Sequence, residues 1–309
     1  MYFKTNENTA ASSILIILGL FLINFLFLGS LIQIGVLLAS GTSLEEMMQS
    51  GGDFSKVPNA WLSMIVGQGL GSFVGFVGTA WLYWRVIEKK QWRDLNFKSL
   101  PTIRVFFMVI LIEVCFMGFN GWLQELNQNF VFPESMKGLE TFLKSMEDKL
   151  SETTKFFTNF TSFWQFILAF VVIAVIAGVG EELVFRGLLM RKLLLGTKNI
   201  HVAIWLSGFI FAVIHFQFYG ILPRMMLGVL FGYLYYWTGN LWVPIAAHVF
   251  NNGVAIIIMY LYNLKIVKTD LESIDHVPMP IVFFSLIATA GLLFLFKNYV
   301  HKQSVESQS

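Results

Sequence analysis

The chain has few charged residues and a single cysteine, and both shortages limit what it can be. Of its 309 residues, 13% are charged and 56% are hydrophobic, a balance that water-soluble domains do not show. The formal net charge is only +2, and no basic stripe with interleaved aromatic residues is present, so no nucleic-acid partner is expected. Cys115 alone excludes a disulfide or a cysteine-based metal site within one monomer.

Apolar segments long enough to cross a membrane make up most of the sequence. A helix needs about 20 apolar residues to span the hydrocarbon core of a bilayer. Such segments occur near 12–40, 62–84, 103–123, 162–180, 202–219, 224–238, 241–262 and 279–297. The sequence therefore predicts an all-α, polytopic membrane bundle of about eight transmembrane helices.

The distribution of lysine and arginine predicts the orientation of the bundle. Basic residues cluster in the segments 85–104 and 186–198, which follow the second and fourth predicted spans. Cytoplasmic loops carry such an excess of positive charge. The segments 41–61 and 124–161 hold more acids than lysines and are expected outside. We therefore predict a multi-pass integral membrane protein with both termini in the cytoplasm.

Two segments are expected to be architectural. Gly67, Gly71 and Gly75 recur every four residues, a spacing that lets a neighbouring helix approach closely. In the outer connection, apolar residues spaced by three and four align on one helical face; they are Leu139, Phe142, Leu143, Met146 and Leu150. This pattern favours a helix on the outer membrane surface, with a lid over a substrate as the alternative.

Polar side chains interrupt three of the apolar segments. Glu181, Glu182 and Arg186 lie in the first, His215 follows in the second, and the third contains His248 and Asn252; the fragments read EELVFR, FAVIH and HVFNN. An ionisable side chain at the bilayer centre costs roughly 3 kcal/mol on insertion scales. We therefore expect these groups to meet in one buried polar site.

Helical spacing separates the expected roles. Glu182 and Arg186 stand four residues apart, acid before base, which predicts a buried ion pair. Glu181 projects about 100° away around the helix, so its carboxylate stays available and can face His215 across the turn near residue 196. His248 and Asn252 are one helical turn apart and share a face. A further intramembrane acid, Glu113, is expected to line the cavity or form a hydrogen bond, without a direct catalytic part.

A carboxylate, two imidazoles and a carboxamide suit the hydrolysis of an amide bond. A base can remove a proton from water while hydrogen-bond donors stabilise the tetrahedral oxyanion. One glutamate and two histidines can also hold a zinc ion that activates water, although the HExxH motif of common zinc proteases is absent. The residue types leave both mechanisms open.

The three motifs occur in a recognisable order. EExxxR begins at Glu181, FxxxH at Phe211 and HxxxN at His248, and together they resemble the CAAX prenyl endopeptidase and bacteriocin-processing family of intramembrane proteases, also called the Abi family. The resemblance covers about 160–255. It divides the chain into N-terminal transmembrane helices with the outer segment (1–160), a catalytic core (161–262), and a last transmembrane helix with a cytoplasmic tail (263–309).

The resemblance implies an intramembrane endopeptidase with a CAAX protease-like, metalloprotease-like site. Glu181 would be the general base, His215 would hold the water, and His248 with Asn252 would form the oxyanion site. Glu182 and Arg186 would support the fold. We expect no cofactor, since Glu182 should be occupied by Arg186 and no other carboxylate is identifiable to orient a zinc-binding histidine. If a zinc ion is present, its ligands are expected to be Glu181, His215 and His248.

The expected partners are the lipid bilayer and a membrane-associated peptide or lipidated protein. Eukaryotic relatives cut the last three residues after a prenylated cysteine, whereas bacterial relatives act on bacteriocin leaders or peptide signals. The short termini favour a bacterial plasma membrane. Two other functions are open at this point: a non-enzymatic membrane immunity or scaffold protein of the same fold, and a proton-coupled transporter, which would predict paired repeats with broken helices.

Overall fold

The computed structural model describes residues 9–50, 59–267 and 276–306. These residues form helices joined by turns, with no strand among them. Several long helices contain π-helical stretches; the label η is used for these stretches and for the short 3₁₀ helices η5, η6 and η9. The first span is α1 (Ala10–Leu22), η1 (Ile23–Leu28) and α2 (Gly29–Ala39); the second is α4 (Ala60–Ser72), η3 (Phe73–Gly78), α5 (Thr79–Trp81) and η4 (Leu82–Ile87).

The remaining spans surround the predicted site. They are α6 (Ile103–Gln128); the continuous series α8 (Phe163–Ala169), η7 (Phe170–Ile176), α9 (Ala177–Glu182), η8 (Leu183–Leu189) and α10 (Met190–Thr197); α11 (Ile200–Val213); α12 (Ile221–Thr238), preceded by the 3₁₀ turn η9 (Phe218–Gly220); α13 (Trp242–Asn263); and α14 (Met279–Glu306). Between spans lie α3 (Leu44–Gln49), η5 (Trp92–Leu95), η6 (Glu134–Met136) and α7 (Lys137–Thr158).

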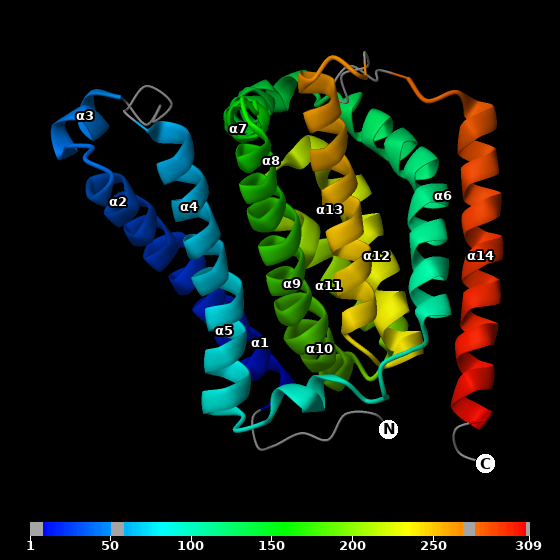
Figure 1. The fold of residues 1–309 in the computed structure, drawn as a ribbon. Coiled ribbons are helices and arrows are strands. Elements are labelled where there is room, and N and C mark those ends of the chain that lie inside the picture. Colours follow the sequence, from blue (N-terminus) through cyan, green and yellow to red (C-terminus); the bar gives the residue numbers. More distant parts are fainter. Residues whose placement is uncertain (1–8, 51–58, 268–275, 307–309) are drawn as a thin grey trace.

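Seven helices in the described ranges are long and apolar enough to cross a membrane, and α11 is an eighth, shorter apolar helix of 14 residues. The protein is therefore an all-α polytopic bundle, as the sequence predicts. Figure 1 shows α1 beginning and α14 ending at the same end of the bundle. The side of the membrane on which this end lies stays a prediction.

The predicted span 202–219 is wrong at its C-terminal end. The helix stops at Val213, and Phe216 adopts a left-handed backbone conformation with φ of 55°. The imidazole of His215 explains the early stop, because its Nδ1 lies 2.7 Å from the carbonyl oxygen of Phe211 and satisfies an acceptor at the helix end. His215 therefore sits on a turn, where its ring is held by the helix that precedes it.

Glycines let the spans cross closely at two places. A Cβ added to Gly71 would lie 3.3 Å from the Cα of Gly29, so α2 and α4 touch through their backbones. A Cβ on Gly228 would lie only 2.8 Å from the Cα of Gly208, which puts α11 and α12 in similar contact. The predicted packing role of Gly71 is confirmed, and the second crossing brings the elements that carry His215 and Arg224 together.

The largest apolar core surrounds the stretch that follows the two glutamates. Phe185, Leu188 and Leu189 are almost fully buried there, together with Phe211 and Phe76 from other spans. A site built next to such a core is held in one geometry, since packed interiors deform little.

Candidate active site

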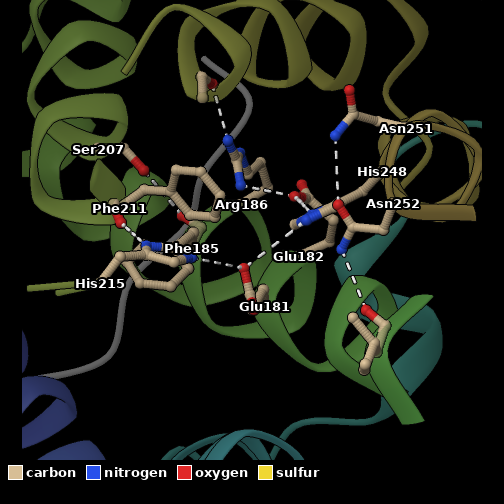
Figure 2. A network of polar contacts seen from close by, with 12 residues as sticks. Glu181, Glu182, Phe185, Arg186, Ser207, Phe211, His215, His248, Asn251 and Asn252 are labelled. Carbon is tan, nitrogen blue, oxygen red and sulfur yellow. Dashed lines mark hydrogen bonds and ion pairs between the residues drawn. The ribbon is translucent and has the colours of Figure 1, made fainter. Parts of the chain in front are cut away.

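Glu181 and Glu182 lie in the middle of the longest span. The six-residue α9 that carries them is flanked by two π-helical stretches, η7 and η8. Such stretches often mark functional sites because they change the direction of side chains along a helix. Glu181 is 7% exposed and Glu182 is fully buried, and the two carboxylates point to different partners (Figure 2).

Glu182 forms the predicted ion pair with Arg186. Its Oε1 lies 2.6 Å from Nη1 of the arginine, and neither side chain has any exposed surface. Nη2 of Arg186 donates to the carbonyl oxygen of Gly228 at 2.8 Å, and the guanidinium lies against the rings of Phe211 and Phe231. The arginine therefore joins three spans, its own and those of α11 and α12, which agrees with its predicted structural role.

Glu182 also accepts a hydrogen bond from His248. The Nδ1 atom of this histidine, on α13, lies 2.9 Å from the same Oε1 that binds Arg186 (Figure 2). The expectation that Arg186 alone occupies Glu182 is therefore wrong, because one carboxylate oxygen has room for two donors. Glu182 orients the imidazole, in the way that carboxylates orient catalytic or metal-binding histidines.

Glu181 faces both histidines. Its Oε2 lies 3.8 Å from Nε2 of His215 and 3.7 Å from Nε2 of His248, distances too long for direct hydrogen bonds (Figure 2). Within the described residues, Glu181 Oε2 is buried and has no hydrogen-bond partner. The structure thus brings Glu181, His215 and His248 to one point.

The Nε2 atoms of the two imidazoles determine what the space beside Glu181 can bind. His215 uses Nδ1 on the Phe211 carbonyl, and His248 uses Nδ1 on Glu182, so a neutral ring in either position carries its hydrogen on Nδ1. Both Nε2 atoms then present lone pairs toward an unpartnered carboxylate oxygen. Three acceptors face one another here without a donor, so the point suits a water molecule, which can donate to two of them, or a cation, which can bind all three.

The same three atoms fit a divalent metal by donor type. Two imidazole nitrogens and one carboxylate oxygen are the ligand set of several zinc hydrolases, and both Nδ1 atoms are anchored as such ligands normally are. No group of three or more His, Cys, Asp or Glu side chains stands in metal-binding geometry among residues 9–50, 59–267 and 276–306. A metal ion would therefore have to draw these ligands closer together.

Asn252 is hydrogen-bonded to two groups other than the three converging side chains. Its Nδ2 donates to the carbonyl oxygen of Ile173 at 3.2 Å, and its Oδ1 accepts from Asn251 at 3.2 Å. The amide nitrogen keeps a second hydrogen beyond these contacts. Glu113 is 1% exposed on α6, and its Oε1 has no hydrogen-bond partner among the described residues, nor does it form an ion pair with either histidine.

A cavity of about 600 Å³ gives access to Glu181 and His215. Its walls are mostly apolar, with Phe21, Phe25 and Phe76 from the first two spans. A further part of the wall comes from α7, whose Met146, Lys149 and Leu150 line the same cavity. The amphipathic helix therefore covers the cavity, which favours the lid alternative over a helix that only rests on the membrane.

The turn that carries His215 is also tied to α7. Oε2 of Glu147 accepts the backbone N–H of Tyr219 at 3.1 Å. At the C-terminal end of α7, Nδ2 of Asn263 donates to the carbonyl oxygen of Thr158 at 2.6 Å. The helix is thus fixed to η9 in its middle and to α13 at its end.

Arg224 is a cation near the site that the sequence did not single out. Its Nη2 donates to Oε1 of Gln217 at 2.5 Å, and Gln217 lines the cavity. Its Nη1 is buried without a hydrogen-bond partner in the described part of the chain. An arginine at the start of an apolar span was the available signal, because such residues are costly in a membrane.

Comparison with known proteins finds a family model that resembles part of the chain. The family model described as type II CAAX prenyl endopeptidase Rce1-like matches residues 163–254, which contain all three motifs. This segment is therefore similar to the Rce1-like family. Its bounds agree with the resemblance predicted over about 160–255.

Curated relatives match a part of the chain of similar length. Uncharacterized protein YpbD of Bacillus subtilis is 33% identical over 82 residues, which are 25% of this chain and 39% of the relative. Membrane-embedded CAAX protease MroQ of Staphylococcus aureus is 30% identical over 110 residues, 34% of this chain and 44% of the relative. Putative membrane peptidase YdiL of Bacillus subtilis is 31% identical over 105 residues, 34% of this chain and 41% of the relative.

The matches cover about two fifths of each relative's length. No solved structure matches the chain significantly. The match to the Rce1-like family model and the seven long apolar helices of the described residues support a multi-pass membrane protein with similarity to membrane proteases.

Proposed function

We propose that this protein is an intramembrane endopeptidase that hydrolyses a peptide bond through a water molecule activated by Glu181. The observation that carries this proposal is the buried, unpartnered Oε2 of Glu181, which faces Nε2 of His215 and Nε2 of His248 at 3.8 and 3.7 Å. A water molecule at this point can donate its two hydrogens to Glu181 and to Nε2 of His215, so its hydrogens are held and its oxygen lone pair is directed elsewhere.

The proton moves through Glu181. A water donates one hydrogen to Glu181 and the other to Nε2 of His215, and its oxygen attacks the carbonyl carbon of the peptide bond. Glu181 takes the proton as general base, and then gives it to the amide nitrogen as the carbon–nitrogen bond breaks. The acyl product keeps the second hydrogen of the water as a carboxylic acid, which ionises in solvent, and the other product is a free amine. Glu181 returns to its starting state as a carboxylate.

His248 and Asn252 are the proposed donors to the oxyanion. Since His248 already donates from Nδ1 to Glu182, it can serve only with hydrogens on both ring nitrogens. Asn252 would use the amide hydrogen that does not bind Ile173. Positioned donors of this kind stabilise the charge that develops in the transition state.

We propose that the reaction needs no resident metal ion. If zinc binds, Glu181, His215 and His248 would hold it, and it would supply Lewis-acid activation of the water. The hydrogen bond from His248 to Glu182 would orient the imidazole with or without a zinc ion. The two mechanisms differ in the role of Glu181, which is the general base in the proposed one.

The proposed substrate is a membrane-associated peptide or a lipidated protein. The apolar walls of the cavity, with Phe21, Phe25 and Phe76, suit an aliphatic side chain or a lipid chain beside the scissile bond. Lys149 is the cation on the lid wall, where a substrate carboxylate could pair with it. MroQ is named a CAAX protease, so peptides that end in this motif are the first probes to use.

The test uses the full chain in lipid nanodiscs and internally quenched peptides that end in CAAX, with and without a farnesyl group on the cysteine. Mass spectrometry of the products gives the bond that is cut. We expect cleavage by the parent protein and by Glu113→Gln, a matched change at a buried acid outside the three converging side chains. Loss of cleavage in Glu113→Gln with retention in Glu181→Gln would contradict the proposal.

A further inference from the structure

The cavity that contains Glu181 extends toward one end of the bundle. Three residues of α7 and Phe216, on the turn after α11, line it there; the three are Met146, Lys149 and Leu150. Helix α7 lies at the end opposite to the one where α1 begins and α14 ends (Figure 1). Lys149 and Phe216 are exposed, so the cavity reaches the surface at this end, which we call the α7 end.

The opposite end of the bundle is closed beyond Glu181 by a packed core. The side chains that fill it are at most 1% exposed: Tyr83, Trp84, Leu188 and Leu189. Nε1 of Trp84 donates to the carbonyl oxygen of Gln91 at 2.8 Å, and the hydroxyl of Tyr235 donates to that of Leu95 at 2.5 Å, so η5 is fixed over this core. None of the described residues of η4, η5 and α10 lines the cavity. Since packed interiors deform little, a peptide reaches Glu181 through the cavity at the α7 end.

The two ends also differ in positive charge. The closed end carries four arginines in the segments that directly follow spans; they are Arg85, Arg93, Arg104 and Arg191. The connection 124–161, which contains α7, holds no arginine and more acids than lysines. Lysine and arginine gather in cytoplasmic loops close to the ends of spans. This distribution predicts that the closed end faces the cytoplasm and that the α7 end faces outward.

We propose that the active site takes its substrate from the extracytoplasmic face of the membrane. This inference rests on the proposed hydrolysis and narrows its substrate to a peptide or lipidated segment whose scissile bond lies in the outer leaflet or at the outer surface. The apolar part of such a substrate would lie against Phe21, Phe25 and Phe76. A protein lipidated in the cytoplasm presents its peptide at the closed end, where the packed core separates it from Glu181.

Cysteine labelling tests the orientation without an activity assay. Cys115 is the only cysteine of the chain, so Cys115→Ser gives a background for single cysteines. Lys149→Cys places a thiol at the mouth of the cavity and Arg93→Cys places one at the closed end, and both positions are exposed. In sealed right-side-out membrane vesicles, a membrane-impermeant maleimide should label Lys149→Cys, and should label Arg93→Cys only after permeabilisation. The reverse pattern would overturn the proposal.

Cleavage from each side of the membrane tests the route to Glu181. The probe is a quenched peptide with charged, membrane-impermeant dyes that the parent protein cleaves in nanodiscs, where both faces are open. It is added to sealed right-side-out and to sealed inside-out vesicles. We expect cleavage in the right-side-out vesicles and its loss in the inside-out vesicles, where permeabilisation should restore it. Vesicles with Glu181→Gln measure the background from host proteases.

A bulky maleimide on the thiol of Lys149→Cys should abolish cleavage relative to the same variant without the label. Labelling of Arg93→Cys in permeabilised vesicles should leave cleavage unchanged. Cleavage in inside-out vesicles alone would overturn access from the outer face and keep the proposed hydrolysis. If the parent protein cleaves no probe even in nanodiscs, the proposed hydrolysis fails, and the labelling pattern still decides on which side the cavity opens.

Discussion

Nδ1 of His248 lies 2.9 Å from Oε1 of Glu182, and this contact ties the last motif of the sequence to the first. The same carboxylate oxygen binds Arg186 at 2.6 Å. Glu182 therefore holds α9 and α13 in register and leaves the neighbouring Glu181 free to face both histidines. The adjacent glutamates therefore differ in their contacts: Glu182 binds Arg186 and His248, whereas Oε2 of Glu181 has no hydrogen-bond partner among the described residues.

Replacement of Arg186 by alanine should destabilise the fold. The change leaves the buried carboxylate of Glu182 without its cation, and breaking a buried pair in this way costs about 3–5 kcal/mol. Thermal or denaturant unfolding in detergent measures the loss. Arg104→Ala, at an exposed position, is the control. An Arg186→Ala protein that is as stable as the parent but inactive would assign the arginine to the chemistry.

Metal dependence separates the two ways of activating water. We expect peptide cleavage to persist in the presence of a strong zinc chelator, and elemental analysis to find much less than one zinc ion per chain, because Glu181 acts as the base. If a chelator abolished the activity and stoichiometric zinc restored it, this prediction would be wrong, and Glu181, His215 and His248 would be metal ligands.

A methyl group at Gly228 should disturb the crossing of α11 and α12. The added Cβ would lie 2.8 Å from the Cα of Gly208, and both atoms belong to packed helices. We expect Gly228→Ala to lower stability by about 1–3 kcal/mol, the usual cost of overpacking. Gly291→Ala, which meets nothing within 4 Å, should be neutral or slightly stabilising. Equal effects of the two changes would contradict the close crossing.

The free energy of unfolding should depend on pH through the buried carboxylate of Glu88, which directly follows the second span. Hydrogen bonds from Lys192 and Lys90 outweigh the effect of burial and lower the pKa of Glu88 below its usual 4.5. Lys192 lies 2.6 Å from Oε1 of Glu88 and Lys90 lies 2.9 Å from Oε2. Because the pKa is lower in the folded state, the stabilisation is complete above about pH 4.5 and is lost as the pH falls through the folded value.

Unfolding measured across this range should show the loss in the parent protein. In Glu88→Gln, the part of the pH dependence that comes from this carboxyl should disappear, and the protein should be less stable at neutral pH because Lys192 stays buried without its acid. An unchanged pH profile in Glu88→Gln would show that the pair contributes nothing.

Much of the fold followed from the sequence because a membrane imposes simple rules. Apolar length located the spans, and the spacing of Glu182 and Arg186 predicted their ion pair. The break after Val213 was not predictable, since it depends on the His215 side chain replacing a backbone donor at the Phe211 carbonyl. Hydropathy does not detect such a contact, so the apolar run through residue 219 read as one helix.

The sequence predicted which side chains come together, but it did not predict all of the hydrogen bonds that they form. The rule that polar groups in lipid must meet brought Glu181, His215 and His248 together. It did not show that Glu182 also binds His248, nor that Asn252 donates to Ile173, because both depend on how α9 and α13 rotate against each other. The cover of α7 over the cavity depends on packing between distant segments, which an amphipathic pattern alone does not specify.

The most direct test of the account compares the parent protein with Glu181→Gln on the probe that the parent cleaves best, at equal protein loading in nanodiscs. Glutamine keeps the size of the side chain and removes the base, so the unfolding temperature should stay close to that of the parent while the rate falls by about 10²–10⁴-fold. A folded Glu181→Gln protein that cleaves at the parent rate would contradict the assignment of Glu181 as the base that activates water.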